Sequence, residues 1–115
     1  MKLFSYSSCS TCRKAIQWLK NKDIDFELIA LLKSPPSKEM LISASEQYGD
    51  RKYLLNTNGV IYRSIGSDVV KKMSDKELFE KLFFEPRLIK RPFLYKSNKC
   101  LLVGFKEEKW AEKLL

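Results

Sequence analysis

Residues 3–15 of the chain read Leu3-Phe4-Ser5-Tyr6-Ser7-Ser8-Cys9-Ser10-Thr11-Cys12-Arg13-Lys14-Ala15. A short apolar strand ends here in a polar turn, and apolar residues at helical spacing begin directly after it. A Cys-X-X-Cys motif at the start of a helix has unpaired backbone N–H groups and the positive end of the helix dipole beside its first sulfur, which favours the thiolate. We therefore expect Cys9 to be a nucleophile and Cys12, nearly one turn further on, to be the thiol that resolves it into a disulfide.

Length and composition favour a single compact domain over residues 1–115, because the chain is 44% hydrophobic and long enough to bury a core. No apolar run approaches the roughly 20 residues that span a bilayer. The 3 cysteines do not resemble the framework of a secreted domain. With no histidine, and with only Cys100, in an apolar stretch, outside the motif, we expect neither a bound metal nor a bound cofactor. A cytoplasmic protein with a transient disulfide fits these features.

The formal net charge of +8 favours an anionic partner, such as nucleic acid, an acidic protein surface or an oxyanion. Charge alone does not choose among them. The basic residues in segments such as 106–113 alternate with Asp and Glu. We interpret them as solvated helix surface and expect no sequence-specific binding of nucleic acid.

The order of predicted elements indicates the fold. A strand over 2–6, a helix over about 10–22 and a strand over 24–29 form a parallel unit. The expected elements that follow are a helix over about 37–48 capped by Ser37 and stopped by Gly49, short turns over 54–66, a helix over 75–84 capped by Ser74, strands over 91–95 and 100–104 joined by a turn at 97–99, and a helix over 106–114. This order predicts an α/β, thioredoxin-like (glutaredoxin-type) mixed sheet. Its core would lie at about 1–33 and 88–115, with a helical insertion over about 34–87 before the C-terminal hairpin.

Five ordered segments resemble the arsenate reductase (ArsC)/Spx family, and together they cover almost the whole chain. They are Tyr6 to Ala15, Pro35-Pro36-Ser37, Leu55 to Gly66, Leu88 to Phe93 and Leu102 to Phe105. The family contains enzymes and regulators, so the resemblance implies different roles in different branches.

The reductase branch implies that Cys9 attacks arsenate, after which glutathione and glutaredoxin release arsenite. Arg91 matches the arginine of the family's Arg-Pro segment. Two further arginines of that branch fall near Asn56 and Gly104, where this chain has none. Because a buried oxyanion needs several charge-assisted donors, this difference disfavours arsenate as the substrate.

The Spx branch implies a different outcome of the same oxidation. There a Cys-X-X-Cys motif is a disulfide switch in a protein that binds the α subunit of RNA polymerase, and the glycine of that contact falls at Gly49. A third branch is proposed to use glutathione. Glutaredoxin or thioredoxin is a further expected partner, so an oxidoreductase and a transcriptional regulator both remain open.

The resemblance also implies an anion site at the start of the first helix. Thioredoxin-like folds have a cis proline facing the cysteine turn, and Pro92 stands at that position. Arg91 would then lie near Cys9, where it could stabilise a thiolate or an anion. Ser10, Thr11 and Arg13 could donate to the same anion, although simple helix capping explains them equally well.

Overall fold

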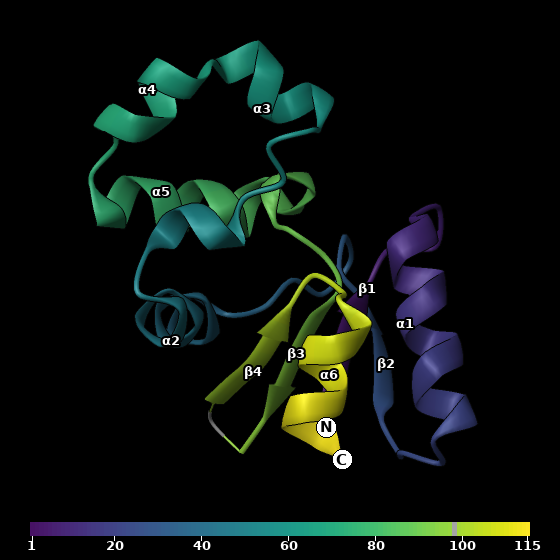
Figure 1. Cartoon of the computed structure of the whole chain (residues 1–115). Helices are drawn as coiled ribbons and strands as arrows, with labels where there is room; N and C mark the ends of the chain where they lie inside the picture. The colour runs from purple at the N-terminus through teal and green to yellow at the C-terminus, as the bar shows by residue number, and fades with distance from the viewer. Residues whose placement is uncertain (98) are drawn as a thin grey trace.

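The structure is a computed structural model that describes residues 1–97 and 99–115. It contains a four-stranded mixed sheet in the order β2-β1-β3-β4 (Figure 1). The strands are β1 (Lys2–Ser5), β2 (Glu27–Ala30), β3 (Phe93–Lys96) and β4 (Lys99–Val103). Strand β1 is parallel to β2 and antiparallel to β3, and β3 is antiparallel to β4. This is the mixed α/β sheet that the sequence predicted.

Helices make up the segment between β2 and β3, as expected. The α-helices are α1 (Ser10–Asn21), α2 (Lys38–Tyr48), α3 (Val60–Ile65), α4 (Ser67–Lys72), α5 (Asp75–Phe84) and α6 (Glu107–Leu114), and the 3-10 helices are η1 (Arg51–Leu54) and η2 (Pro86–Leu88). Within the described part of the chain, no helix combines the length and the apolar character needed to cross a membrane.

Local signals set the helix ends. The Ser37 hydroxyl accepts a hydrogen bond from the Met40 N–H at 3.2 Å, and Gly49 ends α2 with a φ of +79°. Ser74 and Glu77 form a capping box at the start of α5. The predicted caps and the predicted stop at Gly49 are therefore confirmed.

Two strands begin later than the sequence predicted. The backbone N–H of Ile24 donates to the carbonyl of Leu19, so residues 24–26 still belong to the link after α1, and β2 begins at Glu27. Strand β3 begins at Phe93 rather than Arg91, because Pro92 has no N–H to offer to a sheet. The predicted turn at 97–99 includes Asn98, which lies outside the described residues.

A hydrophobic cluster packs against each face of the sheet. Helices α1 and α6 cover one face through Trp18, Leu19 and Trp110, while the insertion, including α2 and α5, covers the other. The pairing of β3 with β4 shifts register between Leu94 and Tyr95. Because of this shift, the neighbouring residues Leu101 and Leu102 both pack with the hydrophobic cluster under α1 and α6, instead of facing opposite sides of the sheet.

Candidate functional site

The two cysteines of the motif differ in exposure. Cys9 is the N-cap residue of α1, and its own backbone N–H donates to the carbonyl of Tyr6 at 3.0 Å. Its side chain makes no capping hydrogen bond and is half-buried. Cys12, inside the first turn of the helix, is only 1% exposed. Both are free thiols, so an external molecule meets Cys9 first.

The electrostatic surroundings separate the two thiols further. Partial burial acts to raise the pKa of Cys9, but hydrogen bonds from the Cys12 backbone and thiol and the nearby Arg91 guanidinium outweigh it and lower that pKa below its ordinary value. Burial instead raises the pKa of Cys12 to about 12, helped by the adjacent Cys9. Cys9 is therefore the thiol that ionises first.

Arg91 is held beside this pair by two contacts. Its guanidinium lies over the ring of Tyr6, with Cζ 5.0 Å from the ring centroid, and it donates to the carbonyl of Arg87 at 3.2 Å. The Arg91–Pro92 peptide bond is cis, as the resemblance implied, and Pro92 is buried. The carbonyl of Pro92 accepts the backbone N–H of Gly104 at 2.8 Å, which joins the start of β3 to the end of β4.

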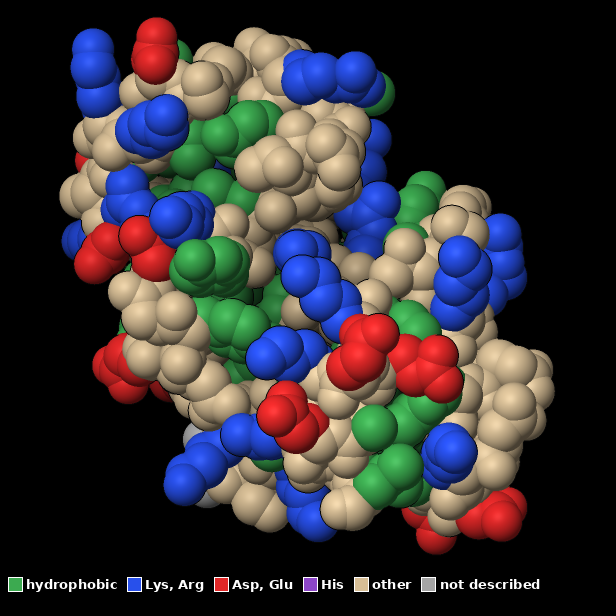
Figure 2. Space-filling model, viewed as in Figure 1, with side chains coloured by type: hydrophobic (Ala, Val, Ile, Leu, Met, Phe, Trp, Pro, Cys, Tyr) green, Lys and Arg blue, Asp and Glu red, His purple; other side chains and the backbone are tan. Residues whose placement is uncertain are grey.

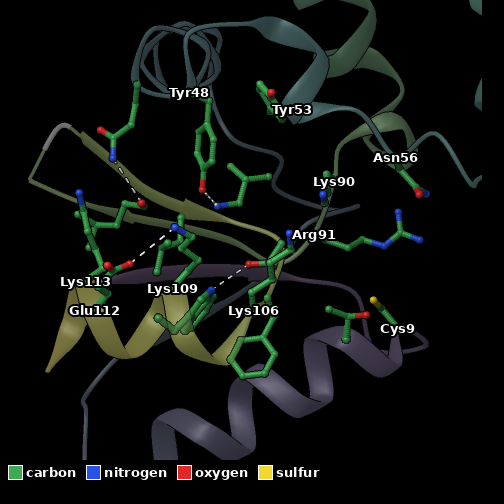
Figure 3. A pocket seen from close by; sticks show the side chains of 18 of the residues that line it. Cys9, Tyr48, Tyr53, Asn56, Lys90, Arg91, Lys106, Lys109, Glu112 and Lys113 are labelled. Atoms are coloured by element: carbon green, nitrogen blue, oxygen red, sulfur yellow. Dashed lines mark hydrogen bonds and ion pairs between the residues drawn. The ribbon is translucent and has the colours of Figure 1, made fainter.

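A cleft of about 670 Å³ opens from this pair and runs between α2, the end of β4 and α6 (Figure 3). Cys9 and Thr11 line one end of it. Its other walls include five basic side chains and one carboxylate: Lys90, Arg91, Lys106, Lys109, Lys113 and Glu112. In Figure 2, several Lys and Arg side chains lie near the centre of the face shown, with Asp and Glu side chains beside them. The cleft is therefore strongly electropositive.

The structure brings only one of the three predicted anion donors into the cleft. Thr11 lines it. Ser10 and Arg13 are exposed and are not among its lining residues, and the Arg13 guanidinium donates to the carbonyl of Ser7 at 3.0 Å. Arg13 thus fastens the turn before α1 instead of facing the cleft.

Asn56 and Gly104, where the reductase branch would have arginines, both line the cleft. The amide of Asn56 lies 3.5 Å from the carbonyl of Arg87, the same oxygen that accepts from Arg91. Gly104 has a φ of +75°, and a Cβ on it would lie 2.9 Å from Cε of Lys90. The side chain of Lys90 therefore occupies the space beside Gly104 and brings one positive charge there.

Several lining residues were not found from the sequence. Lys106, Lys109 and Lys113 are exposed, as expected for helix surface, but they also line the cleft. Their i, i+3, i+7 spacing was a usable signal, because it places them on one side of a helix. Tyr48, which lines the cleft, and Tyr6, which lies outside it and contacts Arg91, gave no signal, since their contacts are with distant segments. The Tyr48 hydroxyl accepts the N–H of Val103 at 2.8 Å, and burial raises its pKa.

Gly49 lies apart from Cys9. It is exposed at the end of α2 and borders a separate shallow depression with Ser45, Asp50, Arg51 and Asp75. A partner that contacts Gly49 would therefore use a surface different from the basic cleft.

Cys100 is buried and faces the cluster on the insertion side of the sheet, where burial raises its pKa to about 12. Within residues 1–97 and 99–115, no group of three or more His, Cys, Asp and Glu side chains is arranged to hold a metal ion.

Comparison with known proteins gives a consistent picture. The chain is 38% identical over 109 residues to the uncharacterized protein YusI of Bacillus subtilis (strain 168), covering 93% of this chain and 92% of that protein. It is 32% identical over 108 residues to the global transcriptional regulator Spx of Lactiplantibacillus plantarum, covering 92% of this chain and 80% of Spx.

Among solved structures, a possible arsenate reductase from Streptococcus mutans UA159 superposes with a TM-score of 0.85 at 33% identity, covering 91% of this chain and 90% of that one. The model of the ArsC family matches residues 4–113. This chain belongs to the ArsC family.

Proposed function

We propose that this protein carries out thiol–disulfide exchange through Cys9 and Cys12. One observation carries the proposal: a half-exposed thiol with a lowered pKa lies next to a buried thiol with a raised pKa, and Arg91 lies beside them. This asymmetry matches what an attacking thiol and a resolving thiol need, because the thiolate is the reactive form.

The reaction begins when the Cys9 thiolate attacks one sulfur of a substrate disulfide. The substrate S–S bond breaks, a Cys9–substrate S–S bond forms, and the departing thiolate takes a proton from solvent. The charge of Cys9 is then gone, which removes a cause of the raised pKa of Cys12. Cys12 gives up its proton and attacks Sγ of Cys9, which releases the second substrate thiol and leaves the Cys9–Cys12 disulfide.

Two electrons pass from the cysteine pair to the substrate, so a cellular thiol must return two electrons to the pair. Glutathione, acting directly or through glutaredoxin in a reducing cytoplasm, is the co-substrate we propose, and the dithiol of thioredoxin is the alternative donor. Arsenate fits the site less well, because Asn56 and Gly104 replace the two arginines of the reductase branch, and Lys90 beside Gly104 lacks the planar fork with which arginine holds an oxyanion.

Mass spectrometry of the native protein across a graded thiol buffer tests this proposal. We expect the loss of two hydrogen masses on oxidation in wild type and in Cys100→Ser, and no such loss in Cys9→Ser or Cys12→Ser. Cys12→Ser should instead accumulate a mixed disulfide on Cys9. A pair that stays reduced under every buffer would overturn the proposal.

The regulatory relative supports a second candidate function. Because a protein 32% identical to this chain is named a global transcriptional regulator, the same oxidation could control binding to the α subunit of RNA polymerase through Gly49. That residue is exposed and has no atom within 4 Å of the position of an added Cβ, so a partner can approach it closely.

Co-purification with RNA polymerase under reducing and oxidising conditions tests the regulator. Gly49→Arg should abolish capture by its bulk, whereas Gly49→Asn should retain it, because Asn tolerates the left-handed conformation. Cys9→Ser should leave capture intact but insensitive to oxidation. If wild type captures no polymerase in either state, only the exchange reaction remains.

A further inference from the structure

The cations of the cleft form a row that starts at Cys9. In Figure 3, Arg91 lies nearest to Cys9, and Lys106, Lys109 and Lys113 follow along α6 away from it. Lys106 precedes α6 as its N-cap, and the four residues of helix from Lys109 to Lys113 correspond to a rise of about 6 Å. Positive charge therefore continues well beyond the reacting sulfur.

Most of this charge has no acidic partner. Within the described part of the chain, the only ion pair that involves a cation of the cleft is Lys109 with Glu112 at 3.8 Å, and both side chains are largely exposed. Glu107 and Glu108 of the same helix are not among the lining residues. Lys90, Lys106 and Lys113 are thus free to bind an anionic group from outside.

Lys106 stands at a position that helix stability disfavours. It is the N-cap of α6 and makes no side-chain capping hydrogen bond. Ser, Thr, Asp and Asn are preferred there, and a cation opposes the positive end of the helix dipole. A lysine that weakens its own helix is explained when its ammonium group has a ligand in the cleft.

The form of the cleft fits an extended ligand better than a compact one. A tetrahedral oxyanion would occupy a small part of 670 Å³ and would reach only the cations nearest Cys9. Lysines are point charges on flexible stems, which suit separate carboxylates better than the planar fork of arginine that grips one oxyanion from two sides.

The floor of the cleft is apolar. Leu101, Leu102 and Val103 of β4 line it together with Phe105 and Trp110. Aliphatic side chains offer little to a phosphate backbone, but they suit the apolar side chains of a peptide. A peptide with carboxylates around an apolar centre matches both the rim and the floor.

We propose that the cleft selects acidic peptide segments of a partner protein, and that such a segment presents the disulfide that Cys9 attacks. This proposal rests on the exchange reaction proposed above, but its binding step can be measured without that reaction.

Binding is measured by fluorescence polarisation with labelled peptides that carry serine in place of cysteine. The acidic peptide is Glu-Glu-Leu-Ser-Leu-Glu-Glu, and the basic one has Lys at each Glu. We expect the reduced protein to bind the acidic peptide more than about tenfold tighter, with affinity falling as salt is added. Lys109→Gln/Lys113→Gln should weaken binding about three- to tenfold. Lys76→Gln/Lys81→Gln removes the same charge from the exposed surface of α5, outside the cleft, and should change it less than about twofold.

Three results would overturn the proposal: equal binding of acidic and basic peptides, equal weakening by the two double variants, or displacement of the acidic peptide by a single-stranded oligonucleotide of equal charge at lower concentration. The last result would identify nucleic acid as the better ligand. Failure of Cys9 and Cys12 to form a disulfide would refute the exchange reaction while leaving this binding unchanged.

The second measurement joins binding to chemistry. The same peptides with cysteine, activated as mixed disulfides with 2-thiopyridine, release a chromophore when Cys9 attacks. We expect the acidic peptide to react faster than the basic one, and Lys109→Gln/Lys113→Gln to remove most of that difference. Alkylation of Cys9 by neutral iodoacetamide should be unchanged in that variant. Equal rates for both peptides, with normal alkylation, would refute the selectivity and leave the exchange reaction standing.

Discussion

The guanidinium of Arg91 lies over the ring of Tyr6, with Cζ 5.0 Å from the ring centroid. Tyr6 also holds the turn before α1, because its carbonyl accepts the backbone N–H of Cys9. A cation over an aromatic face is worth about 0.5–1 kcal/mol at exposed sites. One residue therefore positions both the thiol and the cation that lowers its pKa.

Loss of either partner should make Cys9 harder to ionise. Arg91→Gln removes the charge and one hydrogen bond that favour the thiolate, so the pKa of Cys9 should rise and its alkylation at neutral pH should slow. Tyr6→Leu should shift the pKa in the same direction but less far, because the guanidinium remains. The measurement is the rate of iodoacetamide alkylation against pH. Arg63→Gln, on the exposed surface of α3, is the control, and an unmoved Cys9 midpoint in Arg91→Gln would refute this role.

The buried thiols should make the reduced protein lose stability in alkali. Burial raises the folded-state pKa values of Cys12 and Cys100 from 9.0 to about 12. Below pH 9 both thiols are protonated in the folded and the unfolded chain, and their contribution to the free energy of unfolding is complete. As the pH rises from 9 towards 12, the thiols ionise in the unfolded chain only, and this contribution is lost. Each can lower the free energy of unfolding by up to about 1.4 kcal/mol per pH unit in that window. Urea unfolding at several pH values should give a shallower fall for Cys100→Ala than for wild type. Equal slopes would show that Cys100 ionises normally in the folded state.

Arg51 should stabilise the insertion more than its surface position suggests. Its guanidinium donates to the carbonyls of Val70 and Lys71 at the end of α4, at 3.4 and 3.3 Å, and pairs with Asp75 at 2.8 Å. Arg51→Lys loses the fork that reaches these carbonyls and should lower the free energy of unfolding by about 1–2 kcal/mol. Asp75→Asn removes an ion pair whose carboxylate is exposed and a negative charge in the first turn of α5, and it should lower the free energy of unfolding by less than about 1 kcal/mol. Urea unfolding measures the stability of both variants, and hydrogen exchange should show the loss in Arg51→Lys as reduced protection in residues 67–84. Equal losses of stability in the two variants would contradict the importance of the carbonyl contacts.

Two glycines with positive φ offer a matched comparison of strain and crowding. Gly49 and Gly104 have φ values of +79° and +75°, and an alanine in that conformation costs about 1–2 kcal/mol. An added Cβ meets nothing within 4 Å at Gly49 but would meet Cε of Lys90 at Gly104. Because the end of a lysine side chain can move, Gly49→Ala and Gly104→Ala should lower the free energy of unfolding by similar amounts. Only Gly104→Ala should weaken binding of the acidic peptide, since it displaces the Lys90 ammonium group. A much larger loss of stability in Gly104→Ala would show that Lys90 cannot move aside.

Local signals made much of the fold predictable, and distant contacts explain what was missed. The caps at Ser37 and Ser74 and the stop at Gly49 depend on neighbouring residues, so the sequence revealed them. The start of β2 depended on how the chain leaves α1 and was placed at Ile24 instead of Glu27. The Cys-X-X-Cys motif likewise depends on neighbouring residues, so the sequence indicated that Cys9 and Cys12 lie together at the start of α1.

The basic cleft could not be predicted, because its walls come from segments far apart in the chain. The spacing of Lys106, Lys109 and Lys113 indicates a shared helix side, but not that this side borders Cys9. The contacts of Tyr48 with Val103 and of Tyr6 with Arg91 likewise depend on the assembled sheet. These contacts exist only after the hairpin has packed beside β1.

The register shift between β3 and β4 means that the number of residues in the β3–β4 hairpin cannot change without altering how the strands pair. Leu101 is the extra residue of β4 and has no pairing partner in β3, so the side chains after it lie on the opposite faces of the sheet from those that strict alternation would give. Just after the strand, the carbonyl of Gly104 accepts a hydrogen bond from the indole N–H of Trp110 at 3.0 Å, which ties the end of β4 to α6. Deletion of Leu101 would restore strict alternation and point that carbonyl elsewhere. We therefore expect relatives with a cleft like this one to accept no insertion or deletion between residues 99 and 104.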